Sequence, residues 1–112
     1  MKIYTDIEEL IVNEAPHGNG INYRYENFHQ NKERITFCNG YDLMDENGFY
    51  EAEIPFKVII DRLGGVKIIF RGLTRHGRYL ITKYDLREYL EDVYSDFARS
   101  AIARYSLEEM FK

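Results

Sequence analysis

The strongest hydrophobic pattern in the chain is an alternation between residues 49 and 60. Apolar side chains recur at every second position from Tyr50 to Ile60, with three charged residues, Pro55 and Ile59 between them. A period of two is typical of a strand that buries one face, and a proline, which cannot donate a backbone hydrogen bond, indicates an edge or a bulge. We therefore predict an antiparallel strand over residues 49–61.

A hairpin is predicted by Asn47-Gly48, which directly precedes this strand. Asn-Gly is the preferred sequence of a two-residue type I′ turn, which would pair Arg34 with Asp61 and Tyr41 with Ile54. This register sets apolar residues of both arms against one another on one face, as a buried face requires. The sequence predicts a long hairpin, with Asn39-Gly40 in its first arm as a bulge or a competing turn.

Two more segments alternate in the same way, one on each side of the hairpin. The downstream segment, residues 65–71, can be joined to the hairpin by a three-residue loop at Arg62-Leu63-Gly64 with the glycine in the left-handed conformation. A five-residue loop is the alternative. In the upstream one, Tyr23 and Tyr25 alternate with polar residues, so both rings are expected in the core. We predict a four-stranded antiparallel meander with strands over residues 21–28, 34–46, 49–61 and 65–71.

Helical spacing occurs at both ends of the chain. Apolar residues recur every three or four positions from Leu86 to Tyr105, after the cap-like Thr82-Lys-Tyr-Asp85, which predicts a helix over about 83–104. Thr5-Asp-Ile-Glu8 predicts a short helix to about Val12, and Ser106-Leu-Glu-Glu109 a restart at the C-terminus. We expect one α+β domain over residues 1–112, with the helices packed on one face of the sheet.

Composition agrees with one ordered domain in a reducing compartment. The chain has 112 residues, of which 45% are hydrophobic and 30% charged. The N-terminal residues lack the apolar run of a secretory signal, and no apolar run approaches the length of a membrane span. The single cysteine, Cys38, cannot form an internal disulfide. We expect a cytoplasmic protein without membrane contact.

Charge is sorted along the chain although the net charge is only -4. Residues 57–87 hold eight Lys or Arg and two acids, whereas residues 1–56 hold eleven acids and four bases. The basic connector over residues 71–78 combines arginines, which bind phosphate bidentately, with glycines, which free backbone N–H groups. It has neither Walker nor dinucleotide-binding spacing, so a solvated loop is the alternative. The candidate anion-binding residues are Lys67, Arg71, Arg75, His76 and Arg78.

A second candidate site is an acidic end of the hairpin. The predicted register sets Asp42 opposite Glu53 and Met44 opposite Glu51, and like charges opposed on a sheet need a cation, an arginine or open solvent. Arg71, diagonal to Glu53, is expected to supply that charge. The spacing is not that of an EF-hand loop, so no metal is assigned. The acidic interaction patch comprises Asp42, Asp45, Glu46, Glu51 and Glu53.

Catalytic motifs are missing from the sequence. His17, His29 and His76 fall in three separate predicted loops, and the chain has no HExxH pair, nucleophile elbow or CxxC. Cys38 is expected on the outward face beside Lys57, as a small filler. No cofactor is expected. On the long helix, Tyr84 and any ring off the apolar stripe are expected to contact a partner.

The leading hypothesis is a small non-catalytic cytoplasmic binding protein that acts through its surface, such as an accessory or inhibitor protein of a mobile element. Its partner is expected to be another protein, with a homodimer through the exposed sheet face as one form. Anion or nucleic-acid binding through the basic connector is an alternative that the overall acidity does not favour. A metal-dependent hydrolase using the hairpin carboxylates is the other alternative.

Overall fold

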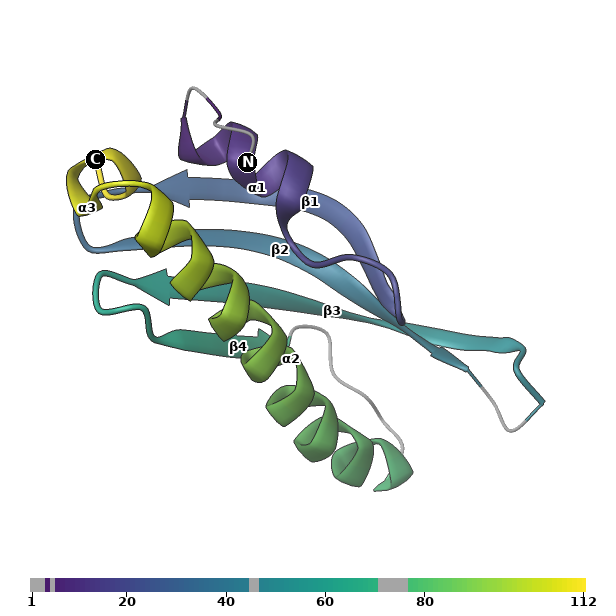
Figure 1. Ribbon diagram of the computed structural model, residues 1–112. Helices are drawn as coiled ribbons and strands as arrows, with labels where there is room; N and C mark the ends of the chain where they lie inside the picture. Colours follow the sequence, from purple (N-terminus) through teal and green to yellow (C-terminus); the bar gives the residue numbers. More distant parts are fainter. Residues whose placement is uncertain (1–3, 5, 45–46, 71–76) are drawn as a thin grey trace.

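The fold is α+β, with a four-stranded antiparallel meander and helices on one side of it (Figure 1). The computed structural model describes residues 4, 6–44, 47–70 and 77–112, and for residues 23, 44, 50, 51 and 77–85 only the backbone. Its strands lie in the order β1-β2-β3-β4, as the sequence predicts. The described elements are α1 (Ile7–Glu14), β1 (Ile21–Gln30), β2 (Arg34–Met44), β3 (Tyr50–Asp61), β4 (Val66–Phe70), α2 (Gly77–Arg104) and α3 (Leu107–Met110).

The central hairpin of β2 and β3 has the predicted register over most of its length. Arg34 pairs with Asp61, and the pairing runs without interruption to Leu43 opposite Ala52. Asn39-Gly40 is therefore neither a bulge nor a turn in this pairing. The prediction is wrong only near the tip, where a register shift after Leu43 sets Met44 opposite Tyr50 instead of Glu51. Such irregularities are common where a hairpin twists most strongly.

The pairing of β3 with β4 also follows the prediction. Phe56 lies opposite Phe70 and Ile60 opposite Val66, so the apolar residues of both strands share one face. The strands are joined by the predicted three-residue loop, in which Gly64 has a φ of 84°. The carboxylate of Asp61 accepts hydrogen bonds from the backbone N–H groups of Leu63 and Gly65. These bonds satisfy donors that the turn would otherwise leave unpaired.

The edge strand β1 is longer and more irregular than its alternation predicts. It continues to Gln30, so His29 lies in a strand and not in a loop. The pairing with β2 shifts twice, between Asn22 and Glu26 and again between Glu26 and His29. Tyr25 and Asn27 have left-handed backbone conformations, with φ values of 49° and 56°. Bulges of this kind protect an edge strand from pairing with another chain.

The helices differ from the sequence prediction mainly at their starts. The N-cap of α1 is Asp6, whose carboxylate accepts a hydrogen bond from the N–H of Glu9, so the helix begins at Ile7. Ser106 caps α3 as predicted. The long helix α2 begins at Gly77, and the cap-like quartet from Thr82 to Asp85 lies inside it. Nothing between these positions breaks a helix, because the segment contains no proline.

The core forms where α2 crosses the sheet diagonally (Figure 1). Tyr94 lies at its centre, fully buried, with its ring packed edge-on against Phe37 of β2 and Phe56 of β3 at centroid distances of 5.9 and 6.0 Å. Most of the predicted stripe of α2 is buried, but the expected place of Tyr89 on it is wrong. Tyr89 is the ring off the stripe, 37% exposed and edge-on to Tyr41. The other buried residues of the stripe are Leu86, Leu90, Phe97, Ala98, Ala101 and Tyr105.

A buried polar chain runs through this core from Asn39, which is 2% exposed. Its side-chain oxygen accepts hydrogen bonds from the N–H groups of Arg24 and Tyr25, both at 2.9 Å. Its side-chain nitrogen donates to the hydroxyl of Tyr94 at 2.9 Å, and that hydroxyl donates to the carbonyl of Pro16 at 3.3 Å. The amide thus replaces the ladder bonds that β1 loses at its first bulge.

Replacing Asn39 with Leu should lower the free energy of unfolding by about 3 kcal/mol, because two N–H groups and one hydroxyl lose their partner together. Tyr94→Phe removes only one link and should cost about 1–2 kcal/mol. Urea denaturation followed by circular dichroism measures both. An Asn39→Leu protein as stable as the wild type would contradict the role given to this amide.

Alkaline pH should act through Tyr94. Burial raises the pKa of its hydroxyl to about 12, from an ordinary value of 10.0. Between these values the unfolded chain loses the proton and the folded chain keeps it, so stability should fall by about 1.4 kcal/mol for each pH unit. Urea denaturation at several pH values should show wild type losing stability above pH 10 more steeply than Tyr94→Phe. Parallel losses in the two proteins would contradict this assignment.

Candidate functional site

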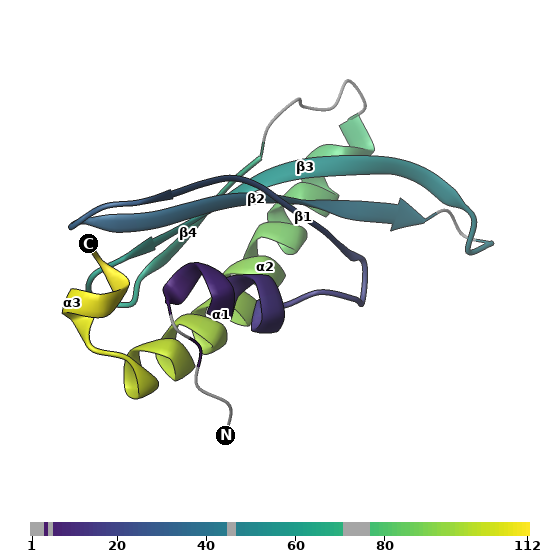
Figure 2. The ribbon, with the colours of Figure 1, turned by 90° about the horizontal axis from the view of Figure 1, so that it is seen from above.

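The candidate site lies on the face of the sheet turned away from the helices, which we call the outer face. Figure 2 shows α1, α3 and the C-terminal part of α2 on the same side of the strands, while the first turns of α2 lie beyond β3 in this view. Strand alternation places the residues between the core positions on the outer face. The charged side chains on this face include four bases and four acids: Arg24, Arg34, Lys57, Lys67, Glu26, Asp42, Glu53 and Asp61.

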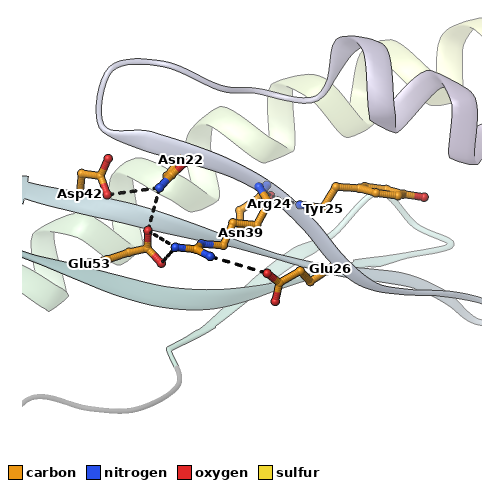
Figure 3. Close-up of polar contacts among 7 residues, drawn as sticks. All are labelled: Asn22, Arg24, Tyr25, Glu26, Asn39, Asp42 and Glu53. Atoms are coloured by element: carbon orange, nitrogen blue, oxygen red, sulfur yellow. Dashed lines mark hydrogen bonds and ion pairs between the residues drawn. The ribbon is translucent and has the colours of Figure 1, made fainter.

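The centre of the outer face is a polar clamp in which Glu53 of β3 reaches across β2 to β1 (Figure 3). Its carboxylate accepts hydrogen bonds from Asn22 Nδ2 and from a guanidinium nitrogen of Arg24, both at 2.7 Å. The crossing depends on Gly40, because a Cβ atom there would lie 2.7 Å from Cδ of Glu53. The glycine in β2 thus leaves room for a side chain from β3 to bind β1.

Two further carboxylates lie beside this clamp. Arg24 also forms an ion pair with Glu26 at 3.8 Å, and Asn22 donates to Asp42 at 3.5 Å (Figure 3). The hydrogen bond from Arg24 holds the pKa of Glu53 below its ordinary value, and the same bond raises the pKa of Arg24. Asp42 and Glu53, which oppose one another on neighbouring strands, are therefore compensated by groups from β1.

A hollow of about 500 Å³ lies next to the clamp on the outer face. Cys38 forms part of its wall and is only 6% exposed, although no described helix covers it. Lys57, directly opposite Cys38 on β3, brings a positive charge to the rim. The hollow is lined by Asn27, His29, Cys38, Lys57 and Ile69.

The carboxylate of Glu53 is bonded to Asn22 and Arg24, which hold it in place on the outer face. Among the described residues, no three His, Cys, Asp or Glu side chains lie close enough together to hold a metal ion. In the part of the chain that was searched, no helix has the length and apolar character needed to cross a membrane.

The predicted acidic patch is brought together only in part. Asp42 and Glu53 lie opposite one another as predicted, half-buried on the outer face. The side chain of Glu51 and the residues Asp45 and Glu46 lie outside the described residues. Among the described residues, the cation at Glu53 is Arg24, from β1, and the predicted Arg71 lies outside them.

The predicted anion-binding residues mostly fall where the structure gives no account of them. Arg75 and His76 lie outside the described residues, together with Arg71. Arg78 is not part of a connector, because its backbone belongs to the first turn of α2. The structure therefore shortens the connector, which ends before Gly77. Lys67 is exposed on the outer face, opposite Ile59 and close to Lys57.

Sequence reasoning missed Asn22 and Arg24 as functional candidates. Their signal was present, because both alternate with residues predicted to be buried and therefore had to point outward. What the sequence could not show was the first bulge of β1, which sets the position of Arg24 relative to Gly40. A glycine facing outward in a central strand was the second signal, since it marks a close approach by another group.

Removing the guanidinium from the clamp should change the titration of Glu53. Arg24→Met should raise the pKa of Glu53, because the largest cause of its low value is the hydrogen bond from Arg24. A depressed pKa stabilises the folded state above the unfolded-state pKa, so this contribution should shrink in the variant and vanish in both proteins at low pH. Carboxyl ¹³C NMR measures the change, with Lys67→Met as the control. An unchanged Glu53 titration would contradict the clamp.

Comparison with known proteins gives no relative on which to base a function. The chain matches no protein-family model, no curated protein and no solved structure among those searched. The function proposed below is therefore argued from the geometry and chemistry of the outer face.

Proposed function

We propose that this chain is a small non-catalytic binding protein whose contact surface for another protein is the outer face of the sheet. The observation that supports this most directly is the packing of α1, α3 and the C-terminal part of α2 on one side of the sheet (Figure 2). A sheet covered on one side only presents a wide, rigid surface held by the core beneath it. Antiparallel sheets can leave such a face to solvent, so its composition decides whether it is suited to contact.

The composition of the outer face resembles that of a protein interface. Ile69 is 38% exposed and lies next to Ile59 and Pro55, both half-buried, while charged residues surround them. Interfaces combine an apolar centre with a polar rim in this way. The hollow beside Cys38 adds a place where a partner's side chain can enter, as pockets at interface centres do.

The clamp adds rigidity to this surface. Glu53, Asn22 and Arg24 join β3 to β1 by charge-assisted bonds, which fix the positions of side chains that would otherwise sample several rotamers. A surface that is ordered before contact loses less entropy when a partner binds. This favours recognition of a defined partner by a preformed surface.

The balance of charge favours protein over nucleic acid as the partner. Four cations and four carboxylates share the described part of the outer face, so the carboxylates would repel phosphate groups near the lysines. An acidic accessory or inhibitor protein that binds a larger protein assembly fits this surface.

Substituting Ile69 tests this function, and the chain offers a matched control. Ile69 on the outer face and Leu107 on α3 are equally exposed, at 38% each. Immobilised wild type and Leu107→Asp should recover the same partner from an extract of the source cells, while Ile69→Asp should recover at least about tenfold less. Circular dichroism should show all three folded. Equal recovery by Ile69→Asp and Leu107→Asp would contradict the assignment of the outer face.

A further inference from the structure

We infer that the protein that occupies the outer face is a second copy of this chain, packed face to face about a two-fold axis. This inference rests on the proposed function, because it names the partner of the same surface. In a two-fold dimer, a patch on one copy contacts a different patch on the other, and the symmetry repeats this contact once more. The outer face must then carry two complementary patches at equal distances from an axis.

The order of charges along the hairpin meets this condition. On the outer face, Gly40 and Pro55 form one opposed pair, with Asp42 and Glu53 one step toward the tip and Cys38 and Lys57 one step the other way. Each step of two residues spans roughly 7 Å. The carboxylates and Lys57 thus lie at equal distances on opposite sides of Pro55. An axis crossing the strands at Pro55 sets the acidic step of each copy against the basic step of the other.

The hollow gives this contact a shape as well as a charge. In this arrangement Asp42 of one copy faces the level of Cys38 in the second copy, where Lys57 and His29 line the hollow. The charge of Glu53 is already balanced by Arg24, which leaves Asp42 as the carboxylate directed to the other copy. The predicted reciprocal contact is Asp42 with Lys57, made twice.

The alternating signs favour a second copy over a partner of uniform charge. A uniformly basic protein would meet Lys57 and Lys67, and a uniformly acidic one would meet Asp42 and Glu26. The size of the surface agrees with a modest dimer. Strands of 10, 11, 12 and 5 residues side by side present roughly 600 Å² per copy, which is near the lower end for specific interfaces. We expect a dimer that dissociates on dilution.

Charge-reversed variants test the two-fold contact. Sedimentation equilibrium should give the wild type about twice the chain mass of 13.4 kDa at high concentration. Asp42→Lys alone and Lys57→Glu alone should each raise the dimer dissociation constant by about a hundredfold, because each places two like-charge contacts in the interface. An equimolar mixture of the two variants should dimerise again, since both contacts then pair opposite charges. Arg99→Glu, on the exposed side of α2, should leave dimerisation unchanged.

Three results would overturn the inference. A wild type that stays monomeric up to about 1 mM excludes the dimer. A dissociation constant of about 1 mM corresponds to a binding free energy of only about 4 kcal/mol. If Ile69→Asp still loses its partner in that case, the proposed function stands and only the second copy is excluded. A dimer unaffected by Lys57→Glu, or a mixture that does not recover, excludes this two-fold contact. An Ile59→Asp protein that is folded but monomeric supports the outer face as the dimer contact, because this substitution leaves Asp42 and Lys57 in place.

Discussion

The side chain of Asn39 hydrogen-bonds three parts of the fold from one buried position. Its amide oxygen holds the bulged backbone of β1, and its nitrogen holds Tyr94 of α2, which in turn reaches the carbonyl of Pro16. A buried amide without these hydrogen bonds would lose its hydration and gain no partner in exchange. The amide, the two N–H groups, the hydroxyl and the carbonyl are therefore ordered together. The position of the edge strand β1 therefore depends on α2, whose Tyr94 bonds the same asparagine.

This dependence reaches the outer face through adjacent residues of β2. Asn39 points into the core and Gly40 outward, as the pleat of a strand requires. The first fixes the backbone N–H of Arg24, and the second leaves the space through which Glu53 reaches the guanidinium of the same residue. Asn39 in the core and Gly40 on the outer face thus together determine the position of Arg24. A rigid contact surface follows from the packing of the core, without further support from a covering layer.

Much of the fold could be predicted because it depends on local patterns that agree with each other. Period-two alternation and turn residues fixed the pairing of Arg34 with Asp61 and of Phe56 with Phe70. The course of β1 could not be predicted, because its bulges are stabilised by Asn39, a residue outside the strand. The predicted register was wrong at the tip, where the pairing shifts after Leu43, and the predicted start of α2 was wrong because cap-like residues are also compatible with a helix interior. Arg24 was missed as the partner of Glu53 because that contact depends on the bulge.

The sorting of charge along the chain acquires a different meaning on the folded sheet. The change from acidic to basic sequence occurs within β3, where Glu53 precedes Pro55 and Lys57 follows it. Because β2 runs antiparallel to β3, the acidic Asp42 falls beside Glu53 and the neutral Cys38 beside Lys57, which separates the signs along one surface. Segregation in sequence alone would favour a partner of uniform charge. Segregation along the β2–β3 hairpin, with the sign change at Pro55, instead gives a strip of the outer face that is complementary to its own rotated copy.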